Sequence, residues 1–195
     1  VAKGLVGHLV GAISGPALYR NASFLRDQAG ELLFPAWVNL RERPFLPRGA
    51  SSAAFDAEGV TTRERNIIEA GILTGYALAS YSARRLGLVT TGNSGGVRNL
   101  LLEPGGIDSD DLVAEMGDGL LVTEVMGQGV NLVTGDYSRG ASGFRVENGE
   151  LAYPVEEITI AGNLRDMFRQ VSGAGRDIDM RGNVHCGHVL ISTMM

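Results

Sequence analysis

Residues 120–163, LLVTEVMGQGVNLVTGDYSRGASGFRVENGELAYPVEEITIAGN, carry the densest strand signals in the chain. Its first half is rich in valine and punctuated by glycine, which is typical of strands interrupted by turns. Residues 143–147 then meet residues 150–154 across Asn148-Gly149. Asn-Gly between two strand-like runs favours a hairpin, because its type I′ turn needs two residues at positive φ. We therefore expect an antiparallel sheet, with residues 158–161 as a further strand, on which the rest of the chain packs.

The composition is ordinary for a soluble globular domain, with 44% hydrophobic and 20% charged residues in a chain of 195. Glycine accounts for 28 residues, about twice the usual ~7%, and its scatter indicates many turns and glycine-rich loops. The net charge of −5 argues against DNA binding, which needs clustered Lys and Arg. No apolar run approaches the roughly 20 residues of a membrane span. The single cysteine excludes an internal disulfide and favours a reducing, cytoplasmic location.

Outside the central stretch, short helices are predicted before Ser14-Gly15-Pro16, over residues 79–86, from Asp108 to residue 116 and over residues 164–171. Residues 61–78 indicate a strand, a glycine turn and a second strand. The expected class is α+β, mainly antiparallel β-sheet with a few short helices and glycine-rich loops. The chain starts without Met and stops as an apolar strand-like run ends. We therefore expect a fragment that lacks an N-terminal domain.

Several polar residues are candidates for chemistry. His8 is the one polar side chain on an apolar helical face, which suits a hydrogen-bonded core histidine, a metal ligand or a catalytic group. Asp56 and Glu58 could share a strand face and bind a cation or act as acid and base, or they could lie in a solvated loop. The loop TTGNSGGVR at residues 90–98 could cradle an anion, but it matches neither common phosphate-binding pattern.

His185, Cys186 and His188 form the one His/Cys cluster in the sequence. Their spacing is poor for zinc, and in a strand Cys186 and His188 would share a face while His185 points to the other. A three-ligand site could add His8 to this cluster, but only if the fold brings the two ends of the chain together.

Long motifs carry a resemblance to a known family. They are GHLVGAISG (7–15), EAGILTGY (69–76), SARRLG (82–87), TTGNSGG (90–96), residues 120–150 and YPVEEITIAGNLRDMF (153–168). Over essentially its whole length the chain resembles the C-terminal domain of the TldD/PmbA family, also called modulators of DNA gyrase. The runs GDYSRGASGF and PVEEITIAGNL resemble the PmbA (TldE) branch rather than the TldD branch.

The resemblance has a consequence for metal chemistry. TldD-type members are metallopeptidases with a helical His-Glu-x-x-x-His motif and a late cysteine as third ligand, the Glu acting as general base on a metal-bound water. In the matching hexad of this chain, Lys3 replaces the first His, Gly4 replaces the Glu, and His8 keeps the second ligand position. Cys186 falls close to the third position, although the alignment there needs a gap.

These replacements predict remnants of a site rather than a working one. A cation at Lys3 repels a divalent metal, and Gly4 has no proton acceptor. His8 and Cys186 supply two ligands, short of the three that catalytic zinc requires. His185 or His188 could supply a third ligand, but neither would replace the missing base. We therefore expect no metal and no catalytic residue in this chain.

The resemblance then implies a non-catalytic partner of a TldD-type subunit that carries zinc and cleaves unfolded peptides. One alternative is a metallopeptidase in its own right, using His8, Cys186 and a neighbouring histidine. Another is a non-enzymatic modulator that binds DNA gyrase. Without its partner the chain could form homodimers, since a pairing surface would be left uncovered.

A glycine-rich sheet suggests how a peptide could bind. Glycines let a second backbone approach closely and pair by strand addition. Gly127, Gly129, Gly135 and Gly140 are the candidates. The alternative is that these glycines serve only turns and bulges of the sheet itself.

Overall fold

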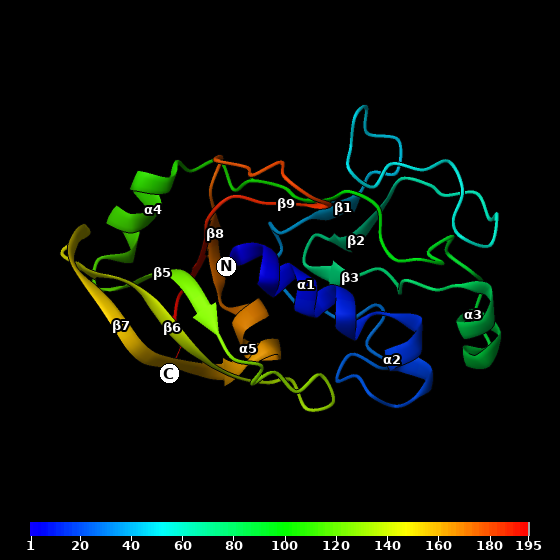
Figure 1. The fold of residues 1–195 in the computed structure, drawn as a ribbon, viewed down its shortest axis with the longest axis horizontal. Coiled ribbons are helices and arrows are strands. Elements are labelled where there is room, and N and C mark those ends of the chain that lie inside the picture. The colour runs from blue at the N-terminus through cyan, green and yellow to red at the C-terminus, as the bar shows by residue number, and fades with distance from the viewer. Residues whose placement is uncertain (195) are drawn as a thin grey trace.

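A computed structural model describes residues 1–194 and is shown in Figure 1. The helices are α1 (Ala2–Ala12), α2 (Gly15–Tyr19), α3 (Ser80–Leu86), α4 (Ser109–Met116) and α5 (Leu164–Arg169). The strands are β1 (Leu40–Glu42), β2 (Arg65–Glu69), β3 (Ile72–Leu73), β4 (Leu100–Leu102), β5 (Gly119–Met126), β6 (Asp136–Glu147), β7 (Glu150–Asn163), β8 (Val171–Ala174), β9 (Val184–His185) and β10 (Val189–Ile191). The predicted class is confirmed, since short helices accompany sheets that are mainly antiparallel.

Three sheets make up the β-structure. The largest has the strand order β3-β2-β1-β4-β9, in which β9 runs parallel to β4 and the other pairs are antiparallel. β10 and β8 form a two-stranded sheet, and β5, β6 and β7 form a three-stranded sheet in chain order. The parallel pair joins residues more than 80 positions apart, and so places the C-terminal segment on the same sheet as the middle of the chain.

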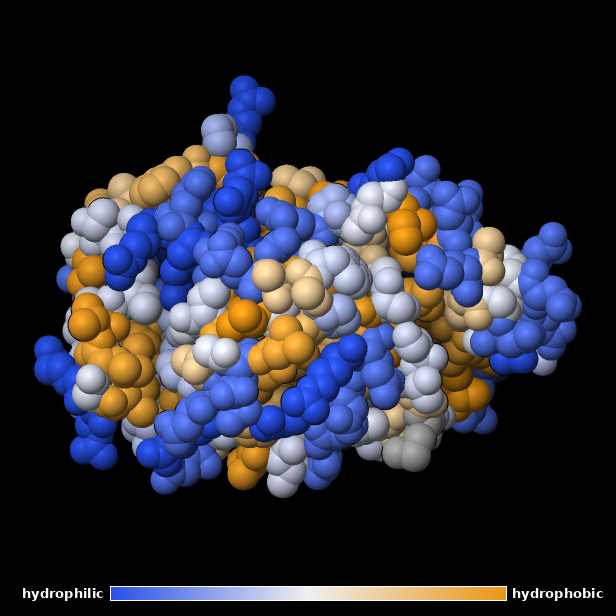
Figure 2. Space-filling view, turned by 180° about the vertical axis from the view of Figure 1, so that it is seen from behind, coloured by the Kyte–Doolittle hydropathy of each residue, from blue (hydrophilic) through white to orange (hydrophobic). Residues whose placement is uncertain are grey.

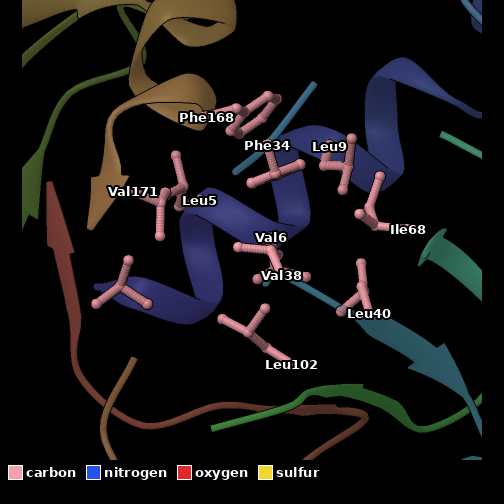
Figure 3. A pocket seen from close by; sticks show the side chains of 11 residues that line it. Leu5, Val6, Leu9, Phe34, Val38, Leu40, Ile68, Leu102, Phe168 and Val171 are labelled. Atoms are coloured by element: carbon pink, nitrogen blue, oxygen red, sulfur yellow. The ribbon is translucent and has the colours of Figure 1, made fainter. Parts of the chain in front are cut away.

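The hydrophobic core lies between α1 and the five-stranded sheet. α1 runs through the middle of the molecule in Figure 1, and its Val6, Leu9 and Ala12 are buried. Figure 3 shows Leu5, Val6 and Leu9 of α1 around a small apolar cavity of about 20 Å³, which side chains of the five-stranded sheet, α5 and β8 also line. Apolar residues at i, i+3 and i+4 make one side of this helix hydrophobic, and burying that side is what stabilises it.

The sheet formed by residues 120–163 is real, but the expectation that the rest of the chain packs on it was wrong. Most residues of β7 are exposed, and no residue of β5 is fully buried. The largest fully buried side chains include Leu40, Ile67, Ile68, Leu73 and Leu100 of the five-stranded sheet, and none of them belongs to β5, β6 or β7. Alternation of apolar and polar residues identifies strands, but it does not say which of two sheets receives the helices.

Local turn chemistry follows the sequence closely. Asn148 and Gly149 have φ of 53° and 81° and join β6 to β7, as predicted for a type I′ hairpin. β7 continues through Pro154 to Asn163 rather than splitting into two strands. Gly87 ends α3 in the left-handed conformation. The predicted helix over residues 164–171 ends earlier, at Arg169, because Val171 already pairs with β10.

Among residues 1–194, no helix combines the length and apolar character needed to span a bilayer. The space-filling view from behind shows apolar residues in several separate patches among hydrophilic ones (Figure 2).

Candidate functional site

Lys3, Gly4, Gly7 and His8 lie on the side of α1 that faces away from buried Val6 and Leu9. The inner side of α1 packs on the core, whereas a Cβ built on Gly4 or Gly7 would have no heavy atom within 4 Å. At 100° per residue, Lys3 and His8 flank these two glycines. The outer surface of the helix therefore has no side chain at these two positions and is open, with the ammonium group of Lys3 on one side and the imidazole of His8 on the other.

Lys3 is held by the C-terminal segment. Its Nζ lies 2.9 Å from Oδ2 of Asp179 and donates a hydrogen bond to the backbone oxygen of Arg181. Hydrogen bonds from Arg181 and then from Lys3 hold the pKa of Asp179 well below its usual range. Asp179 forms a β-bridge with Cys186. The fold thus brings the two ends of the chain together, and it places an ammonium group near the thiol.

Cys186 is buried, and burial raises the pKa of its thiol to about 11. The positive charge of Lys3 opposes this rise but is the smaller effect. A metal ligand must be a thiolate, and burial disfavours the thiolate of Cys186 while no metal ion is bound.

The imidazoles of His185 and His188 have polar partners away from α1. His185 is buried, and its Nε2 lies 3.1 Å from the backbone oxygen of Gly182. His188 is more exposed, and its Nδ1 contacts the carboxylate of Asp177. Each imidazole therefore has a partner outside the remnant site.

His8 packs against the three-stranded sheet of β5, β6 and β7, which we call the hairpin sheet. Its ring centroid lies 5.9 Å from that of Tyr137 on β6, at an interplanar angle of 71°. Burial, and secondarily the cation of Arg139, lower the pKa of His8. His8 is thus a partly buried imidazole of α1 that contacts Tyr137 of β6.

The residues present do not fit a zinc site of the kind that the resemblance implies. Among residues 1–194, no three or more His, Cys, Asp or Glu side chains are close enough to hold one metal ion. The donors near α1 are one imidazole and one neutral thiol, and Lys3 adds a positive charge beside them. Gly4 offers no base on the open side of the helix.

The carboxylates of Asp56 and Glu58 accept hydrogen bonds from backbone N–H groups. Asp56 is buried and accepts hydrogen bonds from the backbone N–H groups of Glu58, Val60 and Ser94, each at 2.9 Å. Burial alone raises the pKa of Asp56, but these donors and Arg98 outweigh it, and the net pKa is lowered. Glu58 accepts from the N–H of Ser80 at the start of α3. Both carboxylates thus organise loops.

The loop at residues 90–98 belongs to a buried polar network that sequence reasoning missed. Glu42 accepts from Arg65 Nε at 2.9 Å, from Asn93 Nδ2 at 2.7 Å and from the backbone N–H of Arg98 at 2.7 Å. Arg65 also donates to Asn93 Oδ1 and to the backbone oxygen of Tyr76. These partners come from separate elements, so no local sequence signal could have revealed them.

The candidate glycines have different structural settings. A Cβ on Gly129 would clash with the backbone oxygen of Ser138, and Gly135 has φ of 87° with Asn163 beside it. Gly127 lies in a turn at φ 79° and faces open space. Gly140 lies on β6, which pairs with β5 on one side and β7 on the other. Close internal packing thus accounts for Gly129 and Gly135.

The edges of the hairpin sheet differ in their capacity to accept another strand. Along the part of the chain that the structure describes, β5 pairs only with β6, so its other edge is free. The outer edge of β7 contains Pro154, which has no N–H, and Glu157 at φ 55°. Proline and local distortion hinder strand addition at β7. β5 has a bulge between Val122 and Glu124 but no proline, so its edge is the better template.

Comparison with known proteins places the chain in a family. Residues 1–195 match the family described as PmbA/TldA metallopeptidase C-terminal domain. The chain is 54% identical over 194 residues to Metalloprotease PmbA of Escherichia coli O157:H7 and 52% identical over 197 residues to a homologue from Haemophilus influenzae. It covers 43% of each of those proteins, so it spans less than half of their length. Their names bear out the resemblance to the PmbA branch.

Solved structures share the fold. A crystal structure from Bacteroides thetaiotaomicron, described as a candidate modulator of DNA gyrase, superposes with a TM-score of 0.94 at 30% identity over 98% of this chain and 44% of that one. TldE from Thermococcus kodakarensis superposes with a TM-score of 0.81 at 26% identity, over 95% of this chain and 46% of that one. The chain therefore belongs to the PmbA/TldD metallopeptidase family.

Proposed function

We propose that this chain is part of a non-catalytic PmbA/TldE-type subunit, which works in the cytoplasm with a TldD-type metallopeptidase that processes unfolded peptides. The observation that carries the proposal is the state of the remnant site. Lys3 is paired with Asp179 where the resemblance expects a metal ligand, Gly4 replaces the base, and no three His, Cys, Asp or Glu side chains of residues 1–194 are close enough to hold a metal ion. The zinc ion and the general base would then come from the TldD-type subunit.

The proposed role of this chain is to hold the peptide. The free edge of β5 presents backbone N–H and C=O groups that an extended peptide can pair with, in the manner of strand addition. Backbone pairing accepts many sequences, which suits an unfolded substrate. Of the four candidate glycines, Gly129 and Gly135 would contribute indirectly, by letting this sheet pack closely at its turns. Gly127 and Gly140 have no such close contacts.

A metallopeptidase that acts alone is the second candidate. It is favoured by the names of the bacterial relatives, which include the word metalloprotease. Such an enzyme would need His8, Cys186 and a third ligand to converge, and a base from outside α1.

Metal content separates the two candidates. The full-length protein, purified without chelator and with zinc present, is expected to hold far less than one zinc per chain and to leave unfolded peptides intact. Adding a TldD-type partner should produce cleavage. Close to one zinc per chain, lost in a Cys186→Ser variant, would refute the non-catalytic assignment.

The peptide-holding role has its own test. In the complex, with the TldD-type subunit inactivated by a substitution, hydrogen exchange is measured with and without a bound peptide. Amides of β5 should exchange more slowly when peptide is present, whereas amides of the outer edge of β7 serve as the control and should not change. Unchanged exchange in β5 with peptide bound would exclude strand addition at this edge.

A further inference from the structure

Arg139, on the central strand β6, is a cation without a carboxylate partner. Among residues 1–194, no Asp or Glu oxygen lies within 4 Å of its guanidinium. Its Nε donates to the backbone oxygen of Met126 at 3.3 Å, which leaves the two terminal nitrogens available. Arg145 on the same strand differs, because it contacts both Asp118 and Glu147.

Two aromatic side chains lie next to this cation. Tyr137 is two residues earlier on β6 and so on the same face, and its ring packs edge-on against His8 of α1. Arg139 lowers the pKa of both groups, in addition to the larger effect of burial, which lowers the pKa of His8 and raises that of Tyr137. His8 is therefore neutral near pH 7, and the cation of Arg139 is not offset by a negative charge.

The cation also has a definite place along the sheet. Its bond to Met126 fixes the guanidinium at the last residue of β5. Gly127, the next residue, has no heavy atom within 4 Å of a built Cβ, so there is room at this end of the strand. A peptide paired along the free edge of β5 would reach this point.

We propose that Arg139, with His8 and Tyr137 beside it, binds a carboxylate of the peptide held on β5 and thereby sets the register of that peptide. The inference rests on the proposed function. Backbone pairing alone leaves the register open, because every residue of a peptide offers the same N–H and C=O groups. A guanidinium binds a carboxylate through two parallel hydrogen bonds, which supplies the missing geometric restraint. The carboxylate could be the C-terminus or an acidic side chain.

Three peptides of otherwise identical sequence distinguish the two sources. One has a free C-terminal carboxylate and no acidic side chain, the second is its C-terminal amide, and the third is an amide with glutamate as the last residue. Affinity for the full-length protein with its TldD-type partner, inactivated by a substitution, is measured by fluorescence anisotropy. At least one carboxylate peptide should bind about tenfold more tightly than the plain amide, as one charge-assisted contact warrants. Arg139→Gln should remove that preference. Whichever carboxylate peptide binds more tightly than the plain amide shows whether the bound carboxylate is the C-terminus or an acidic side chain.

Matched variants keep the test specific. Arg145→Gln should retain the preference, because Arg145 already has carboxylate partners, and Arg139→Lys should retain part of it. Binding of a carboxylate peptide, but not of the amide, should raise the pKa of His8, followed by NMR. Equal binding of all three peptides, or an equal loss of all three in Arg139→Gln, would overturn the carboxylate site and leave the proposed peptide-binding role in place. If no peptide binds, the proposed function itself fails.

Discussion

Replacing Gly7 by alanine should stabilise this protein. Gly7 lies near the middle of α1, and a methyl group there would meet no heavy atom within 4 Å. Glycine in a helix interior costs about 0.8–1.0 kcal/mol relative to alanine, because its backbone loses more freedom on folding. With no clash to offset this gain, Gly7→Ala should raise the free energy of unfolding by about 1 kcal/mol.

The assay is thermal and urea unfolding of the full-length protein. A gain of about 1 kcal/mol corresponds to a rise in the midpoint temperature of roughly 2–4 °C for a domain of this size. Gly15→Ala is the control, because a Cβ on Gly15 would clash with the side chain of Ser82, and this variant should be destabilised. A lower stability in Gly7→Ala would mean that the outer side of α1 is covered, and would refute the open surface described here.

Further predictions follow from the buried groups and the sheet. Glu42→Leu leaves the guanidinium of Arg65 buried without its partner, and should lower the free energy of urea unfolding by about 3–5 kcal/mol; a loss below 1 kcal/mol would contradict the role of the network. The thiol of Cys186 has a pKa raised from 9.0 to about 11, so its contribution to stability is present below pH 9 and is lost as the pH rises toward 11. Alkylation of the native protein should accordingly stay slow until about pH 11, whereas the unfolded chain reacts near pH 9; fast native alkylation at pH 8 would show that the thiol is exposed. Gly129→Ala should lower the free energy of urea unfolding by about 1–3 kcal/mol, because its methyl group would clash with the backbone of Ser138. Gly140→Ala should change that free energy by less than about 0.5 kcal/mol, because its methyl group would make only ordinary contacts.

Features that depend on neighbouring residues could be predicted from the sequence. The Asn148-Gly149 hairpin is local, because two residues at positive φ determine the turn and the turn determines the pairing. The end of α3 at Gly87 is local for the same reason. The expectation that Lys3 and Gly4 stand where the family resemblance places a metal ligand and a base also came from the sequence, since it depends on side-chain type and on the spacing within one helix.

Features that depend on long-range packing could be seen only in the tertiary structure. The parallel pairing of β9 with β4 brings Cys186 near Lys3, and it is this pairing that buries the thiol and raises its pKa. The contact between His8 and Tyr137 likewise joins the first helix to the hairpin sheet.

Local sequence patterns were enough to predict the class of the fold and the Asn148-Gly149 hairpin. The packing of residues 1–194 showed which sheet receives α1, which edges of the three-stranded sheet have no strand partner, and which cations lack a carboxylate partner. The physical reason is that turn and helix preferences act over a few residues, whereas burial and charge pairing depend on the arrangement of elements that are distant in the chain.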